Sequence, residues 1–236
     1  MVDFHSHILP CIDDGSKSVE ESLSMLRMLK TQGVGTVVAT PHFSASRESV
    51  VDFINRREAS YNEIKPFLAE NIPDVLLGAE VSFYDGVSRL ENLELLCAGE
   101  SRLLLIEMPV KKWSESSIRE ICNIACRGDI TVVLAHIERY LNYQSKDAWR
   151  RLLDSGVLMQ VNASFFNSIR TRRKAFSMLR QNILHFLGSD CHNLIHRPPQ
   201  LHQTYSLIEK KMGTKFLSDF TEYHRAMLRV KNSDNQ

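Results

Sequence analysis

The chain begins Met1-Val-Asp3-Phe-His5-Ser-His7-Ile-Leu-Pro-Cys11-Ile-Asp13-Asp14-Gly15, which places two imidazoles two residues apart and two carboxylates shortly after them. If this stretch is a strand followed by a loop, His5 and His7 point to the same face and can bind one metal ion. Ser6 then points to the opposite face. Taken alone, a His-x-His pair near a terminus is equally compatible with two surface histidines. The rest of the chain decides between these interpretations.

Length and composition limit the fold. A chain of 236 residues with 43% hydrophobic residues is long enough for one barrel-sized α/β domain or two small ones, and no linker-like stretch marks a boundary. We expect one domain over residues 1–236, with a frayed tail at 230–236. The net charge of +1 predicts no general attraction to nucleic acid or membranes. An acidic substrate must therefore be bound by local groups.

The cysteines and the apolar runs indicate the compartment. The five cysteines form neither a disulfide framework nor a zinc-ribbon spacing. Too few residues precede His5 for a signal peptide, and no apolar run approaches membrane-spanning length. Cys122 and Cys126 are four apart on an expected helix, which favours two small buried residues over a metal site. We expect a reducing, cytoplasmic setting.

Apolar runs alternate with helical stretches along the chain. Ser18–Glu21 has the pattern of a capping box, and the helix that it starts should end near Gly33. The β-branched run Thr36–Thr40 follows, and the same alternation continues to Asp190. This gives seven β-α units, followed by two helices at about 201–212 and 217–230. The pattern predicts a parallel α/β barrel-like fold.

A polar residue stands at the end of each apolar run. In parallel barrels, the carboxyl ends of the strands form the face that carries the active site. We therefore expect these residues to converge: His7, His42, Glu80, Glu107, His136, Asn162 and Asp190.

Nitrogen and oxygen donors at these positions are too many for one ion and suit a cluster of two or three. Without thiolate, the set favours divalent Mn, Fe or Zn, and Mg alone is less suitable. Any one of them has a simpler explanation as a solvated side chain, but nine together do not. The candidate metal ligands are His5, His7, Asp14, His42, Glu80, Glu107, His136, Asp190 and His192. We assign His185, His196, His202 and His224 to surface or packing roles.

Several short motifs carry a family resemblance from Asp3 to about Pro199. They are His5-Ser-His-Ile-Leu-Pro10, Ile12-Asp-Asp-Gly-Ser16, Ala39-Thr-Pro-His42, Gly78-Ala-Glu80, His136-Ile-Glu-Arg-Tyr140, Gly188-Ser-Asp-Cys-His-Asn193 and Arg197-Pro-Pro199. Through them the chain resembles the PHP (polymerase and histidinol phosphatase) superfamily, and within it the manganese-dependent protein-tyrosine phosphatases of bacterial capsule and exopolysaccharide loci. It departs from the family pattern at Cys11, Ile137 and Cys191, where Gly, Pro and Ala are expected.

The resemblance implies a distorted (β/α)7 TIM-like barrel, the PHP fold, with its metal site at the C-terminal ends of the strands. It implies one metal bound by His5, His7, Glu80 and Asp190, a second by Glu80, Glu107 and His136, and a third by Asp14, His42 and His192. Arg139 and Arg197 would then bind the phosphate as catalytic groups. A hydroxide bridging two metals would be the nucleophile, and phenolate is a tolerable leaving group. The implied partner is a phosphotyrosine protein, a membrane-attached tyrosine autokinase that controls polysaccharide export.

Other functions compete with this one. Cys191 and Arg197 have the Cys-x5-Arg spacing of thiol phosphatases, but the intervening residues contain no Gly and Pro198 follows the arginine. A small-molecule phosphatase acting on a substrate such as histidinol phosphate stays open, because only the resemblance favours a protein substrate. A nuclease is disfavoured by the near-neutral charge. A noncatalytic module would need neither so many ligands nor two arginines.

Overall fold

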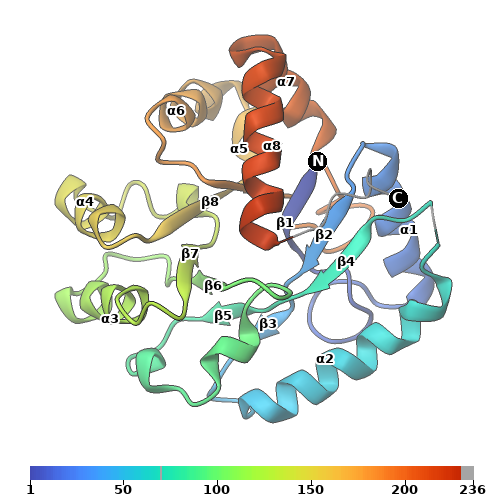
Figure 1. The fold of residues 1–236 in the computed structure, drawn as a ribbon, viewed down its shortest axis with the longest axis horizontal. Helices are drawn as coiled ribbons and strands as arrows, with labels where there is room; N and C mark the ends of the chain where they lie inside the picture. Colours follow the sequence, from blue (N-terminus) through green and yellow to red (C-terminus); the bar gives the residue numbers. More distant parts are fainter. Residues whose placement is uncertain (70, 230–236) are drawn as a thin grey trace.

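A computed structural model describes residues 1–69 and 71–229. The expected frayed tail at 230–236 lies outside the described residues. The chain forms an α/β fold in which parallel strands are surrounded by helices (Figure 1).

The strands form two sheets in which every pairing is parallel. One sheet has the order β1-β2-β4 and the other the order β3-β5-β6-β7-β8-β9. The strands are β1 (Val2–Ser6), β2 (Thr36–Ala39), β3 (His42–Phe43), β4 (Asp74–Leu77), β5 (Glu80–Ser82), β6 (Leu103–Glu107), β7 (Thr131–Leu134), β8 (Leu158–Asn162) and β9 (Phe186–Gly188). A parallel bridge between Ser6 and Cys191 joins the end of β1 to the segment after β9.

The expected class, a parallel α/β fold, is confirmed. The sheet is curled but less regular than a barrel of seven strands. Two of the expected strands are interrupted, so that β3 continues β2 and β5 continues β4. At the first interruption stands Pro41, which has no N–H to donate to a neighbouring strand. The described strands therefore form two sheets. β2 and β4 of the first sheet lead into β3 and β5 of the second, and β1 lies next to the segment after β9.

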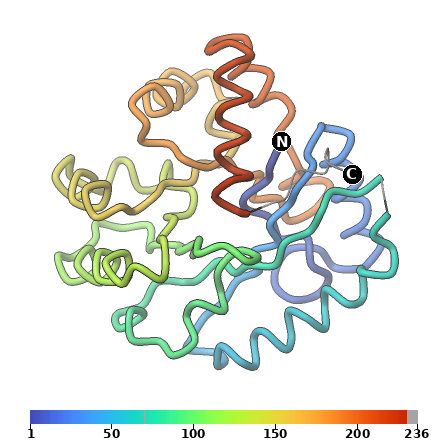
Figure 2. The backbone as a smooth tube through the Cα atoms, viewed as in Figure 1, coloured from blue at the N-terminus to red at the C-terminus, as the bar shows by residue number. Residues whose placement is uncertain are grey.

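In the described part of the chain, eight α-helices follow one another around the strands in chain order (Figure 2). They are α1 (Val19–Thr31), α2 (Val50–Ile64), α3 (Glu115–Ala125), α4 (Lys146–Asp154), α5 (Ser164–Asn167), α6 (Ile169–Arg180), α7 (His202–Met212) and α8 (Thr214–Leu228). In α1 the hydroxyl of Ser18 accepts from the backbone N–H of Glu21, as the capping-box pattern predicts.

Two apolar clusters fill the fold. The larger one lies between the strands and the surrounding helices. The smaller one lies inside the curled sheet and includes Phe4, Leu105 and Phe186, with the rings of Phe4 and Phe186 stacked at 4.2 Å between centroids. Leu228 of α8 packs against it, and Figure 1 shows α8 in red crossing the strands. The space inside the sheet is therefore packed with side chains.

A bulge in β1 turns its polar end toward this interior. Ser6 lies three positions after Asp3, whereas its partner Ala39 on β2 lies two positions after Val37, the partner of Asp3, so β1 contains one extra residue. Phe4 packs in the inner cluster, and His5, the next residue, is also fully buried. The bulge allows two consecutive side chains to face inward.

No helix in residues 1–69 and 71–229 is both long enough and apolar enough to span a membrane.

Candidate metal centre

Four of the predicted ligands meet where β1, β5 and β9 end or begin. His5 Nε2 and His7 Nε2 lie 3.1 Å apart, and Glu80 Oε2 lies 3.2 Å from the first and 3.3 Å from the second. Asp190 Oδ1 lies 3.6 Å from both nitrogens. Donors bound at about 2.1 Å to one tetrahedral ion stand about 3.4 Å apart. The spacing of these four atoms fits one cation.

The second oxygen of Glu80 faces a different group. Glu80 Oε1 lies 2.8 Å from Nε2 of His136, which lies 3.4 Å from Oε1 of Glu107. Glu80 is thus placed between two sets of donors and has one oxygen in each. A carboxylate in that position can bridge two cations.

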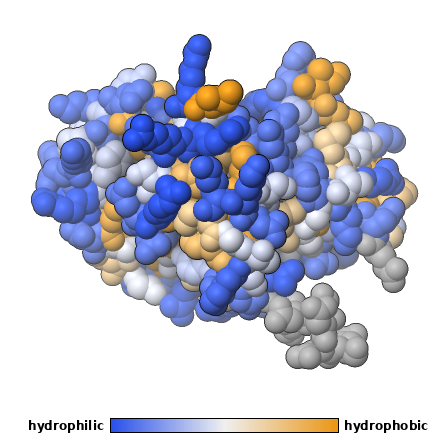
Figure 3. All heavy atoms as spheres, turned by 90° about the horizontal axis from the view of Figure 1, so that it is seen from above, coloured by the Kyte–Doolittle hydropathy of each residue, from blue (hydrophilic) through white to orange (hydrophobic). Residues whose placement is uncertain are grey.

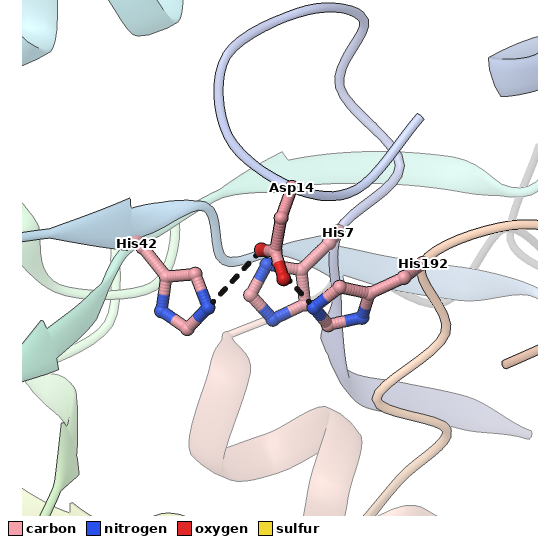
Figure 4. A group of neighbouring side chains, drawn as sticks. All are labelled: His7, Asp14, His42 and His192. Carbon is pink, nitrogen blue, oxygen red and sulfur yellow. Dashed lines mark ion pairs between the residues drawn. The ribbon is translucent and has the colours of Figure 1, made fainter. Parts of the chain in front are cut away.

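Asp14, His42 and His192 form a third set, nearer to solvent (Figure 4). Asp14 Oδ1 lies 3.4 Å from Nε2 of His42 and 3.4 Å from Nε2 of His192. The Nε2 atom of His192 is buried and has no hydrogen-bond partner among the described residues. An unpartnered buried nitrogen beside a carboxylate is what a bound cation would satisfy. The structure thus brings together all nine predicted ligands.

The imidazoles are held by their second ring nitrogen, as metal-binding histidines usually are. His7 Nδ1 donates to Asp13 Oδ2 at 2.7 Å, and His5 Nδ1 lies 3.3 Å from Gln160 Oε1. The remaining contacts are His192 Nδ1 to the backbone oxygen of Asp190 at 3.1 Å and His136 Nδ1 to the hydroxyl of Tyr140 at 3.1 Å. In each case Nε2 is left free to face the other donors.

Asp13 and Gln160 were not predicted. Asp13 also accepts from the backbone N–H groups of Gly15 and His42, at 2.8 and 3.0 Å. Gln160 Oε1 accepts from the backbone N–H of His136 at 2.6 Å. The only sequence signal for Gln160 was a polar residue between two apolar ones in β8. Asp13 was visible beside Asp14, but the spacing could not show which carboxylate faces His7.

Two glycines make room for the imidazoles. A Cβ atom on Gly188 would lie 2.5 Å from Cβ of His5 and 2.8 Å from Nε2 of Gln160. A Cβ atom on Gly15 would overlap the backbone oxygen of His7 and lie 2.6 Å from its Cβ. Larger residues at either position would displace a predicted ligand.

The buried charges favour a cation at this centre. Burial lowers the pKa of His7, but the nearby carboxylates of Asp13 and Glu80 outweigh it and raise the pKa to about 10. Burial raises the pKa of Asp190, yet His5, His7 and Arg197 hold it below its usual range. The carboxylates thus stay ionised and attract protons to His5 and His7, whereas burial lowers the pKa of His136 and His192. A divalent ion would replace those protons.

Both predicted arginines reach the centre. Arg139 Nη2 lies 2.8 Å from Oδ2 of Asp190, and Arg197 Nη2 lies 2.6 Å from Oδ1 of the same residue. Arg139 Nη1 also lies 3.5 Å from Oε1 of Glu107. The side chains are 37% and 40% exposed, so both remain accessible from outside. A guanidinium has five N–H donors, and most of those on Arg197 are not used by these contacts.

Cys191 is unsuited to act as a nucleophile. It is fully buried in the larger apolar cluster, and burial raises the pKa of its thiol. A reactive thiolate requires a lowered pKa and access to the substrate. This supports the rejection of the thiol mechanism. The four histidines assigned to other roles belong to none of the donor groups found in the described part of the chain.

A cavity of about 540 Å³ opens beside the donors. Its lining includes Asp14, His42 and Glu107 of the centre together with Ser44, Arg47 and Arg56. Its size is sufficient for a phosphorylated side chain.

Comparisons with known proteins identify the family of the chain. The family model described as "Capsular polysaccharide synthesis, CpsB/CapC" matches residues 1–228. The tyrosine-protein phosphatase CpsB of Streptococcus pneumoniae is 34% identical over 234 residues, covering 91% of this chain and 92% of the relative. The tyrosine-protein phosphatase YwqE of Bacillus subtilis is 30% identical over 239 residues, covering 97% and 92%.

A solved structure shares the fold. It comes from work described as crystal structures of YwqE from Bacillus subtilis and CpsB from Streptococcus pneumoniae, unique metal-dependent tyrosine phosphatases. The match has a TM-score of 0.84 at 24% identity and covers 98% of this chain and 96% of the other.

Proposed function

Because the chain belongs to the CpsB/CapC family and is by that membership a tyrosine-protein phosphatase, we propose that it hydrolyses phosphotyrosine on a protein at the metal centre described above. The observation that carries the proposal is the cluster of nine nitrogen and oxygen donors beside two accessible guanidiniums. Neither the donor cluster nor the pair of guanidiniums would indicate phosphoryl transfer by itself.

We assign the ligands as three sets. His5, His7, Glu80 and Asp190 would hold the first ion. Glu107 and His136 would hold a second ion together with Glu80, and Asp14, His42 and His192 would hold a third. The spacings of 2.8 to 3.6 Å within these sets support the assignment. Manganese suits mixed imidazole and carboxylate donors, and iron or zinc would also fit.

The metals would supply Lewis acidity and an activated water as the nucleophile. Arg139 and Arg197 bind the nonbridging phosphate oxygens and stabilise the charge that develops on them. Tyrosine has a pKa of about 10, so its phenolate leaves without strong assistance from a general acid. We assign no residue to that role.

The proposal also includes the barrel class, the single domain, the compartment and the protein substrate. We assign the curled sheet to the distorted (β/α)7 barrel of the PHP superfamily and the chain to one domain. The continuous apolar clusters support this assignment. We place the enzyme in the cytoplasm, and the five unpaired cysteines are consistent with that compartment. Its substrate would be a membrane-attached tyrosine autokinase that controls polysaccharide synthesis, since the family is named for capsule synthesis.

The test is a parallel turnover assay on a phosphotyrosine peptide, the matched phosphoserine peptide and histidinol phosphate. Each is assayed with manganese and after chelation. We expect activity on the phosphotyrosine peptide that a chelator abolishes, manganese restores and thiol alkylation leaves largely intact. Faster turnover of histidinol phosphate would favour the small-molecule phosphatase. Loss of activity in Cys191→Ser with unchanged metal content would overturn the metal-dependent mechanism.

A further inference from the structure

Positive charge is concentrated on α6. Its twelve residues include five cations and no carboxylate, whereas the whole chain has a net charge of +1 and the rest of it therefore carries −4. Arg170 lies three and four residues before Arg173 and Lys174, and like charges at these spacings destabilise a helix. None of the five cations has an ion pair with another residue in the described part of the chain.

A cavity of about 250 Å³ runs along these cations. We call it the α6 groove, and it is lined by Ile169, Arg172, Arg173, Phe176, Arg180 and Lys211. Arg180 lies over the ring of Phe176, with the guanidinium carbon 5.8 Å from the centroid. The groove therefore combines an apolar floor with a rim of four cations.

The groove begins near the metal centre. Asn162, at the end of β8, donates to Asp190 Oδ2 at 2.8 Å. Ile169 follows seven residues later and so lies within about 25 Å of that contact. Ile169 and Ile195 are the most exposed large hydrophobic residues described, at 86% and 80%, and they follow the paired strands β8 and β9. In Figure 3, a few hydrophobic groups stand out from a mainly hydrophilic surface.

We propose that the α6 groove binds an acidic segment of the protein whose phosphotyrosine occupies the metal centre. This inference rests on the proposed function. The rim cations have no ion pairs in the described part of the chain and are complementary to carboxylates, although Arg172 also donates to the backbone oxygens of Phe166 and Asn167. The exposed side chain of Ile169 can contact an apolar neighbour of those carboxylates. An anionic membrane fits less well, because the apolar face of α6 is buried in the core and cannot insert into lipid.

The dimensions locate the acidic residues relative to the phosphotyrosine. From Ile169 to Arg180 the helix rises about 16 Å, which an extended segment covers with about five residues. The path from the centre to Ile169 needs at most about seven more. The carboxylates should therefore lie within about twelve residues of the phosphotyrosine.

The test compares phosphotyrosine peptides that carry four Glu or four Gln residues about eight positions from the phosphotyrosine, on either side. With the manganese-loaded full chain, we expect one of the two Glu peptides, the one whose acidic residues reach the α6 groove, to have a kcat/KM about tenfold higher than its matched Gln peptide. The difference should lie in KM, and added salt should reduce it. Arg173→Glu with Lys211→Glu should abolish the preference and leave turnover of p-nitrophenyl phosphate unchanged.

The matched control is Arg27→Glu with Lys30→Glu, which makes the same charge change on exposed positions of α1. α1 joins the end of β1 to the start of β2, so its last turn lies at the opposite end of the strands from the centre. This variant should keep the preference. Equal kcat/KM for Glu and Gln peptides with the unmodified enzyme, or an equal loss in the control, would overturn the inference.

Two further measurements distinguish failure of the groove proposal from failure of the proposed function. Fluorescence anisotropy of labelled, unphosphorylated Glu and Gln peptides reports groove binding even if no phosphotyrosine is hydrolysed. Failure of the proposed function would therefore leave a binding difference that the α6 variant removes. Sedimentation with phosphatidylserine vesicles tests the membrane alternative. If the α6 variant lost vesicle binding and kept the peptide preference, the inference would be wrong.

Discussion

Asp13→Asn should weaken metal binding although Asp13 belongs to none of the proposed ligand sets. Asp13 accepts three hydrogen bonds, from His7 Nδ1 at 2.7 Å and from the backbone N–H groups of Gly15 and His42. An asparagine has one acceptor oxygen, so in either amide orientation at least one donor loses its partner. Each such bond to a charged group contributes about 1.5–3 kcal/mol. Loss of an orienting carboxylate typically lowers metal affinity about tenfold to a hundredfold.

The assay is calorimetric titration of the metal-free protein with manganese, followed by turnover at limiting and excess manganese. We expect Asp13→Asn to bind at least one ion about tenfold more weakly and to regain most of its kcat in excess manganese. Asp14→Asn removes a proposed ligand and should not be rescued. Asp74→Asn, on an exposed residue at the start of β4, controls for the loss of charge. Wild-type manganese affinity in Asp13→Asn would refute the orienting role.

Four further predictions follow from single residues. Glu80→Ala should lose more bound metal by elemental analysis than His192→Ala, because its two oxygens face different donor sets; equal losses would contradict the bridge. Arg197→Lys should lower kcat/KM on a phosphotyrosine peptide about tenfold to a thousandfold with metal content unchanged, since an ammonium loses the planar fork; near-normal turnover would remove the phosphate-binding role. Cys11 has φ +55°, so Cys11→Gly should raise the free energy of unfolding in urea by about 1 kcal/mol, whereas Cys11→Ala should not. Burial lowers the pKa of His224 to about 3, below its unfolded value of about 6.5. The unfolded chain then binds the extra proton, so the stability of the metal-free protein should fall as pH drops below 6.5, by up to about 2.5 kcal/mol at pH 4.5. Denaturation of His224→Gln should show a smaller fall, and an equal fall would show that His224 does not cause it.

The sequence predicted the donors of the centre better than the groups that position them. The ligand residues stand at the ends of apolar runs, and that signal depends only on local pattern. Gln160 contacts the imidazole of His5, which lies 155 positions away in the chain, and such a contact depends on how strands are placed in space. Tyr140 is only four positions from His136, but the sequence does not show that its hydroxyl faces that imidazole. The bulge in β1 was also not predictable, because the same residues in a regular strand would place His5 opposite Phe4.

The structure explains the two cysteines that differ from the family pattern, Cys11 and Cys191, in different ways. Cys11 adopts the left-handed conformation that glycine adopts without strain, which explains why the family pattern has glycine there. Cys191 packs as a small apolar residue with no exposed surface. Ile137 is likewise buried, and nothing in the structure explains why it stands in place of proline.

The packed interior beneath the centre determines the order of events in a catalytic cycle. The side chains inside the curled sheet and α8 fill the space below the donors, so substrate, water and products all pass the same outer rim. In the proposed reaction, inorganic phosphate would form beside the donors, behind the tyrosine from which it is released. The dephosphorylated segment would then depart first and phosphate second. Phosphate should then compete with the incoming phosphoprotein for free enzyme, and slow departure of the segment would limit turnover.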